Sequence, residues 1–128
     1  MKIDRLDHLV LTVKNIEVTA TFYESILGMQ RITFAKNRIA LLFGQQKINL
    51  HELGNEFEPK AQNVMNGSAD LCFIISTPVD QAISQLLSKG IKVIEGPVNR
   101  TGATGPIISV YFRDPDKNLI EVSNYLKN

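Results

Sequence analysis

The two histidines of the chain lie in segments where a metal ligand could be placed. His8 opens the segment 8–13, in which β-branched and aliphatic residues dominate, and His51 lies in the predicted strand 47–52. Glu121 lies in a third such segment, where a carboxylate is costly to bury unless it meets a base or a cation. Imidazole and carboxylate groups together bind divalent transition metals. We therefore predict a metal site made by His8, His51 and Glu121.

An internal repeat predicts that these side chains come together. The first strands begin at His8 and Asp70, and the glycines that follow the helices are Gly28 and Gly90, so both pairs are 62 residues apart. In the last strands we take the offset as 70, which places His51 opposite Glu121. Asp70 then becomes a fourth candidate ligand, although it could instead hydrogen-bond the turn at the start of its strand.

Each half of the chain has the pattern strand, helix and three further strands. The first helix is expected from Ile16 to Leu27, with Asn15 as its N-cap. The second is expected to have Thr77 as its cap and Pro78 as its first residue, and to end at Gly90. The second half carries about eight extra residues within 96–106, which are rich in Gly and Pro and are expected to form a surface loop. This loop could be a lid or only a long connection. The strands are expected at 8–13, 29–34, 38–43, 47–52, 70–75, 91–95, 107–113 and 118–124.

The predicted fold class is α+β, with two βαβββ modules whose curved mixed sheets form a half-barrel around a metal site in its concave face. Module one is expected to span residues 1–58 and module two residues 67–128, joined by a linker at 59–66. Together they are expected to make one domain of 128 residues.

Composition narrows the class of protein. The net charge is +1 and no basic stripe occurs, so nucleic acid is not an expected partner. No apolar run approaches the roughly 20 residues that cross a bilayer, so we expect a cytoplasmic protein without a membrane partner. Cys72 is the single cysteine, which excludes an internal disulfide. It is expected to be a buried, inert thiol.

Several motifs resemble the vicinal oxygen chelate superfamily, and they extend over the whole chain. They are RLDHLVLTV at 5–13, FYE at 22–24, LG at 27–28, YFRDPD at 111–116 and NLIE at 118–121. The superfamily includes glyoxalase I, extradiol dioxygenases, fosfomycin resistance enzymes and bleomycin-binding proteins. The chain looks most like its small glyoxalase-domain members. Lys117 departs from the closing motif, which usually has glycine there.

The resemblance implies metal ligands at His8, His51 and Glu121, with Asp70 in the fourth place. The metal would be Mn, Fe, Ni, Zn or Co, and a small oxygen-rich substrate would chelate it through two vicinal oxygens. Glu121 could also move a proton as a catalytic residue. Asp70 stands where many relatives have histidine or glutamate, which leaves its ligation open. Similar small members form homodimers.

Residues that could bind the substrate follow from charge and from strand alternation. An anionic or oxygen-rich ligand needs cationic or hydroxyl partners, and residues two apart on a strand share a face. Arg113 could instead pair with the acidic turn that follows it. The candidates are Arg113, Tyr111, Arg100, Asn49 and Cys72.

The function expected first is a metal-dependent, glyoxalase-like lyase, isomerase or transferase. One alternative is an Fe(II) extradiol dioxygenase, because two histidines and one glutamate match its ligand set. Another is a metal-free protein that sequesters a drug or other ligand, as bleomycin-binding proteins do.

Overall fold

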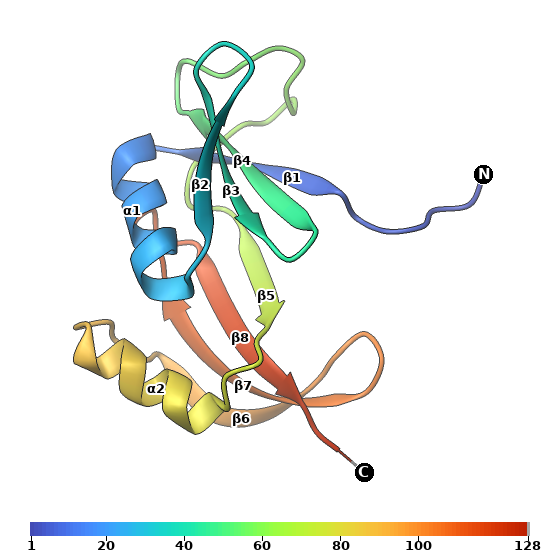
Figure 1. Ribbon diagram of the computed structural model, residues 1–128, viewed down its shortest axis with the longest axis vertical. Coiled ribbons are helices and arrows are strands. Elements are labelled where there is room, and N and C mark those ends of the chain that lie inside the picture. The colour runs from blue at the N-terminus through green and yellow to red at the C-terminus, as the bar shows by residue number, and fades with distance from the viewer. Residues whose placement is uncertain (128) are drawn as a thin grey trace. The chain divides into compact units, whose positions relative to one another are not determined.

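The computed structural model describes residues 1–127, and over these residues the chain forms two compact units. Unit 1 is Met1–Gly67, and unit 2 begins at Ser68. The described residues contain two helices and eight strands, which form two four-stranded sheets (Figure 1). Each unit therefore has the βαβββ order, and the predicted fold class is confirmed. Neither of the helices described in residues 1–127 is long and apolar enough to span a membrane.

Unit 1 is a mixed sheet with one helix. Its strand order is β1-β4-β3-β2, in which β1 and β4 are parallel and the other neighbours are antiparallel. The helix contacts β2, β3 and β4. The elements are β1 (His8–Val13), α1 (Ile16–Leu27), β2 (Gln30–Phe34), β3 (Arg38–Phe43) and β4 (Gln46–Glu52).

Unit 2 repeats this arrangement. Its strand order is β5-β8-β7-β6, with β5 and β8 parallel, and its helix contacts β7 and β8. The elements are β5 (Asp70–Ile74), α2 (Val79–Ser88), β6 (Glu95–Thr101), β7 (Pro106–Arg113) and β8 (Leu119–Tyr125).

Helix α1 forms as the sequence predicts. Asn15 is the N-cap, and its side-chain oxygen accepts a hydrogen bond of 3.0 Å from the backbone N–H of Val18. Gly28 closes the helix in the left-handed conformation, with φ of 66°. Tyr23 and Ala20 are fully buried. The helix thus covers one face of the sheet. The opposite face, which carries His8, is not covered by α1 and can hold a binding site.

The start of helix α2 differs from the prediction. Pro78 is the N-cap, and no side chain of the cap accepts a hydrogen bond. Instead Oδ1 of Asn124, on β8, accepts from the backbone N–H of Val79, while Nδ2 of Asn124 donates to the carbonyl of Thr77. Thr77 is therefore not the cap. The helix end is satisfied by a residue far away in sequence, which local patterns do not reveal.

The segment 96–106 is also different from the expected surface loop. Strand β6 covers Glu95–Thr101, and residues 91–94 are not in a strand. A β-bulge between Glu95 and Val98 accommodates the Gly and Pro residues that indicated a loop. Beyond the bulge, Arg100 pairs with Ile107. The extra residues of module two thus lengthen a β-hairpin.

The register of the sheets corrects the repeat offset assigned to the last strands. His8 pairs with Lys47 on β4, and Asp70 pairs with Leu119 on β8. Matching backbone hydrogen bonds support the equivalence, since Lys47 donates to Asp7 and Leu119 donates to Ala69. Equivalent residues of β4 and β8 are therefore 72 apart and not 70. The repeat partner of Glu121 is Asn49, and the partner of His51 is Ser123.

Candidate functional site

One face of the unit 1 sheet carries three of the polar side chains predicted for the site. Strand alternation places His8, Val10 and Thr12 on this face of β1. Asn49 pairs with Val10 and His51 pairs with Thr12, so both β4 residues lie on the same face. His8 and His51 are offset by four residues along the paired strands, about 13 Å at the rise of a β-strand. Unit 1 therefore does not bring its two imidazoles together.

His8 is exposed and has one ring nitrogen available. Its Nδ1 lies 2.8 Å from Oδ2 of Asp7, which acts as the acceptor when Nδ1 carries the proton. That arrangement leaves the lone pair of Nε2 free to bind a ligand. Metal-bound histidines commonly make this kind of contact to a carboxylate through the nitrogen that does not bind the metal. The local structure at His8 therefore fits a metal ligand.

His51 has a different environment. It is only 3% exposed, and its Nε2 lies 3.2 Å from the guanidinium NH2 of Arg38. Arginine can only donate, so Nε2 is the acceptor and Nδ1 carries the imidazole proton. Burial lowers the pKa of His51, and the positive charge of Arg38 lowers it further. A nitrogen that accepts from a guanidinium is poorly placed to bind a metal.

Replacement of Arg38 by methionine is expected to raise the pKa of His51. The substitution removes the neighbouring charge, while burial, the larger cause of the low pKa, stays. The change is measured by NMR titration of the imidazole nitrogens. In the folded wild type the pKa of His51 lies below its ordinary value of 6.5. At a pH below about 6.5, His51 therefore binds more protons in the unfolded chain than in the folded chain. Stability contributed by neutral His51 is therefore lost as the pH falls below 6.5 towards the folded pKa.

The exposed Arg5 provides the matched control, since Arg5→Met removes the same charge from the N-terminal arm of the chain. The His51 titration should not move in that variant. An unchanged His51 midpoint in Arg38→Met would contradict the role given to Arg38.

The segment 53–64 packs over His51. The ring of Phe57 lies edge-on to the imidazole at 5.4 Å, and the guanidinium carbon of Arg38 lies 4.5 Å from the centre of the Phe57 ring. Glu56 accepts from the backbone N–H of Gly54 and lies 3.3 Å from Nζ of Lys60. Part of the predicted linker thus forms one wall of a cavity. The cavity has a volume of about 490 Å³, and its lining residues are Val10, Thr12, His51, Pro59, Lys60, Ala61 and Val64.

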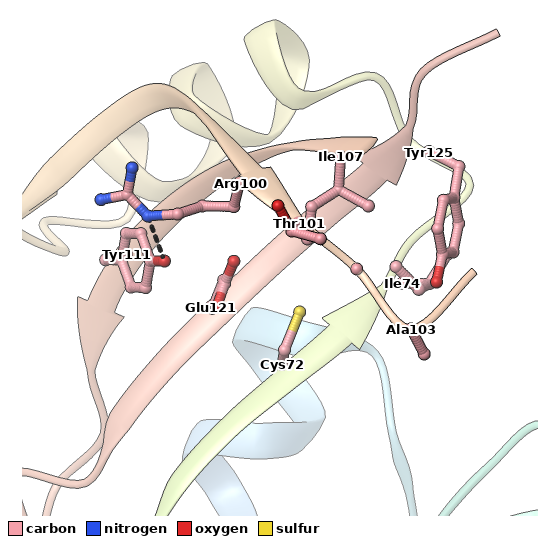
Figure 2. A pocket seen from close by; sticks show the side chains of 10 residues that line it. Cys72, Ile74, Arg100, Thr101, Ala103, Ile107, Tyr111, Glu121 and Tyr125 are labelled. Carbon is pink, nitrogen blue, oxygen red and sulfur yellow. Dashed lines mark hydrogen bonds between the residues drawn. The ribbon is translucent and has the colours of Figure 1, made fainter. Parts of the chain in front are cut away.

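Unit 2 has a cavity of about 380 Å³ on the equivalent face of its sheet. Glu121 on β8 is flanked by Cys72 on β5 and Tyr111 on β7, its direct partners in the sheet. Figure 2 shows these three side chains around the cavity, with Arg100 beside Tyr111 and Tyr125 at the far end. The register thus brings together four residues predicted from sequence: Glu121, Tyr111, Arg100 and Cys72.

Tyr111 and Arg100 form a fixed pair. Nε of Arg100 donates to the phenol oxygen at 3.0 Å, as the dashed line in Figure 2 marks, and NH2 of Arg100 lies 3.3 Å from Oε1 of Glu95. Burial raises the pKa of Tyr111, although the hydrogen bond from Arg100 acts in the opposite direction. The phenol is therefore protonated near neutral pH. Since Arg100 occupies one lone pair, the O–H of Tyr111 remains a donor.

A chain of hydroxyl groups leads to Glu121. Ser109 and Ser123 are fully buried, and their hydroxyl oxygens lie 2.7 Å apart. The hydroxyl of Ser123 donates to Oε2 of Glu121 at 3.4 Å. This contact gives the carboxylate a hydrogen-bond partner from the buried side of the sheet.

Cys72 is exposed, which corrects the prediction that it is buried. The alternation of β5 directs Asp70, Cys72 and Ile74 to the cavity face. Local desolvation raises the pKa of the thiol, and the negative charge of Glu121 raises it further, against the hydrogen bond with Ser123. The thiol is therefore protonated near neutral pH and is a weak nucleophile.

The remaining predicted residues lie apart from the unit 2 cavity. Asp70 is exposed and pairs with Leu119, two residues along the strand from Glu121. Arg113 donates to the carbonyl of Lys117 and so holds the turn that follows β7. Asn49 is 6% exposed, and its Oδ1 has no hydrogen-bond partner among the described residues. Within residues 1–127, neither unit by itself holds three His, Cys, Asp or Glu side chains grouped for a metal.

Sequence reasoning missed the groups that surround His51. Arg38, Phe57 and Lys60 were not among the predicted site residues. Arg38 becomes visible once β3 is paired with β4, because Ile39 pairs with Leu50 and Arg38 then falls beside His51. Phe57 and Lys60 lie in an irregular segment, whose course over the sheet no periodic pattern predicts.

Comparison with known proteins shows the family to which a chain with this fold belongs. The family model of the Glyoxalase/Bleomycin resistance protein/Dioxygenase superfamily matches residues 5–122, so the chain belongs to that superfamily. The chain is 60% identical to virulence protein STM3117 of Salmonella typhimurium over 126 residues, which cover 98% of this chain and 88% of that protein. It is 53% identical to the glyoxalase domain-containing protein RDO1 of Mycosarcoma maydis, over 98% of this chain and 70% of the relative.

A solved structure agrees closely with both units. The integron cassette protein VCH_CASS1 from the mobile metagenome of V. cholerae is 63% identical and superposes with a TM-score of 0.96. The match covers 98% of each chain. The predicted resemblance to the vicinal oxygen chelate superfamily is thus confirmed.

Proposed function

We propose that the chain is a metal-dependent lyase, isomerase or transferase that acts on a small, oxygen-rich molecule. The observation that carries this proposal is that one cavity of unit 2 holds both a carboxylate, Glu121, and a phenol, Tyr111, held by Arg100. A carboxylate accepts a proton and a protonated phenol donates a hydrogen bond, so the pair supplies complementary groups for proton transfer. The resemblance further implies a homodimer, which sedimentation equilibrium of the purified chain tests, and the short apolar runs of the sequence favour a cytoplasmic location.

The proposed metal ligands are Nε2 of His8 and the carboxylate of Glu121. The hydrogen bond between Asp7 and His8 supports the first, because it leaves Nε2 unprotonated. Asp70 and Oδ1 of Asn49 are candidate oxygen donors. His51 does not fit, since its Nε2 accepts from Arg38. A divalent ion such as Mn, Fe, Ni, Zn or Co, when bound, supplies Lewis-acid polarisation of substrate oxygens.

The side chains of unit 2 would act directly on the substrate. Glu121 would take a proton from a carbon next to a carbonyl group, and Ser123 would keep the carboxylate oriented during the transfer. The O–H of Tyr111 would donate to the substrate oxygen on which negative charge develops. Arg100 would hold the phenol in place and contribute positive charge at the same edge of the cavity.

The alternatives differ in what they require. An extradiol dioxygenase site of the predicted kind needs two histidines and one carboxylate. The contact between His51 and Arg38 removes support for the second histidine. A protein that only sequesters a ligand without a metal would not need the free Nε2 lone pair of His8. A measurement of metal binding therefore distinguishes the sequestering function from the metal-dependent enzyme.

Glu121→Gln is expected to weaken metal binding by at least about 100-fold, because an amide replaces a charged ligand. Isothermal titration of the metal-free protein with Mn²⁺, Ni²⁺ and Zn²⁺ measures the effect. The matched control is Glu17→Gln, which makes the same change at the exposed surface of α1 and should bind like the wild type. Equal affinity in Glu121→Gln would refute the ligand assignment, and a wild type that binds no metal would favour the sequestering function.

Activity is tested separately on the metal-loaded protein. A glutathione hemithioacetal assay examines the glyoxalase reaction, and oxygen uptake with a catechol panel examines the dioxygenase reaction. Tyr111→Phe should reduce turnover while metal affinity stays unchanged, because it removes only the donor. A variant with unchanged turnover would exclude the role given to Tyr111.

A further inference from the structure

The cavity of unit 1 contains a hydrogen-bond donor, on the buried residue His51, that the proposed chemistry does not use. His51 lines this cavity and directs Nε2 to Arg38, so the imidazole proton is on Nδ1. Among the described residues, no group accepts from Nδ1. The imidazole carries this N–H whether it is neutral or protonated. A ligand with an acceptor oxygen would complete the hydrogen bonding of the ring.

A second donor lies at the cavity wall. Nζ of Lys60 lies 3.3 Å from Glu56 and 3.6 Å from Glu58. The side chain of Glu56 is only 7% exposed and also accepts from the backbone N–H of Gly54, which fixes its position. An ammonium group has three protons, so two carboxylate contacts leave one for a ligand. Lys60 is thus held in place and still able to donate.

The charge behind the cavity favours an anion. Arg38 has no carboxylate partner among residues 1–127, because its contacts are the imidazole of His51 and the faces of Phe34 and Phe57. Aromatic faces stabilise a cation without neutralising it. Glu56 and the exposed Glu58 together carry more charge than Lys60, but at His51 the positive charge of Arg38 acts more strongly than the negative charge of Glu56.

The remaining walls define the rest of the ligand. Val10, Pro59, Ala61 and Val64 make them apolar, and Thr12 adds one hydroxyl. The volume of about 490 Å³ lies in the usual range for small-molecule sites. Two donors match the two oxygens of a carboxylate, whereas the third oxygen of a phosphate would face an apolar wall.

We propose that this cavity is a binding site for a small carboxylate with a short aliphatic chain, held by Nδ1–H of His51 and by Nζ of Lys60. Arg38 positions the imidazole and supplies the positive potential. His51, Lys60 and Arg38 are not among the proposed metal ligands, so the proposal does not rest on the metal chemistry proposed above. The site makes a carboxylic acid, or the carboxylate end of a larger substrate, the class of ligand to examine.

Butyrate is the probe for this site. Titration of the ¹⁵N-labelled full chain with sodium butyrate should give saturable NMR shifts at His51, Lys60, Ala61 and Val64. Butyramide has the same size without the charge, and it should bind at least about tenfold more weakly. Shifts that do not saturate, or equal binding of butyrate and butyramide, would overturn the proposal.

Two substitutions test the donors separately. Lys60→Met and His51→Phe should each weaken butyrate binding about tenfold, since each removes one hydrogen bond to a charged group. Lys36→Met removes a lysine from the exposed turn between β2 and β3 and should change nothing. If His51→Phe does not fold, the butyrate affinity of Lys60→Met alone tests the proposed site. Wild-type affinity in Lys60→Met would refute the proposed site.

Discussion

Asn118→Ala is expected to lower the free energy of unfolding by about 3 kcal/mol, as two buried hydrogen bonds of its side chain are lost. Asn118 is fully buried and directly precedes β8. Its Nδ2 donates to Oδ2 of Asp114, and its Oδ1 accepts from the backbone N–H of Ala69, both at 2.8 Å. Alanine would leave the N–H of Ala69 without its partner and would deprive Asp114 of one donor.

Urea unfolding followed by circular dichroism measures this loss. Asn99→Ala, at an exposed position of β6, is the control and should change stability by less than about 0.5 kcal/mol. Asn118 also joins the beginning of β8 to the residue before β5, so it helps to set the register that places Cys72 beside Glu121. The variant should therefore also bind metal more weakly. Wild-type stability in Asn118→Ala would show that this buried turn does not hold the two strands.

Gly96→Ala is expected to destabilise the fold by about 3 kcal/mol or more, through backbone strain and a steric clash. Gly96 has a φ of 125°, a conformation that side chains disfavour. A Cβ at this position would lie 2.6 Å from the carbonyl oxygen of Ser109 and 2.8 Å from the Cα of Val110. Both are backbone atoms of β7, so the contact can be relieved only by moving β6 away from β7.

Gly44→Ala separates strain from clash. Gly44 also has a positive φ, of 52°, but a Cβ there would meet nothing within 4 Å. Its expected cost is about 1 kcal/mol, from the left-handed conformation alone. Thermal and urea unfolding of the two variants measure the difference. Equal losses in both would contradict the close approach of β6 to β7.

The sequence predicted the elements that depend on local patterns. The helix 16–27 was correct at both ends, because Asn15 and Gly28 act through neighbouring backbone groups. The cap of α2 was wrong because Asn124, more than forty residues away, supplies it. Gly96 and Pro97 indicated a loop where a bulged strand is found, since tertiary pairing outweighed their local preference.

The candidate site was predicted more completely in unit 2 than in unit 1. Alternation along β5 and β8 placed Cys72 and Glu121 on one face, as their pairing requires. In unit 1 the predicted repeat offset of 70 residues made His51 the equivalent of Glu121. The observed offset is two residues larger, so the equivalent residue is Asn49. Periodicity repeats every two residues, so it identifies the face of a strand but not the position along it.

The lengthened β6–β7 hairpin has a consequence for how relatives can diverge. Arg100 lies in the added length, while the pairing of β7 with β8 does not depend on it. Gly102 closes the hairpin tightly, since a Cβ there would lie 3.0 Å from Cε1 of Tyr125. The length and the side chains of this hairpin tip can change during evolution while the hydrophobic core stays intact. Ligand preference and folding can therefore change independently in descendants of one ancestral gene.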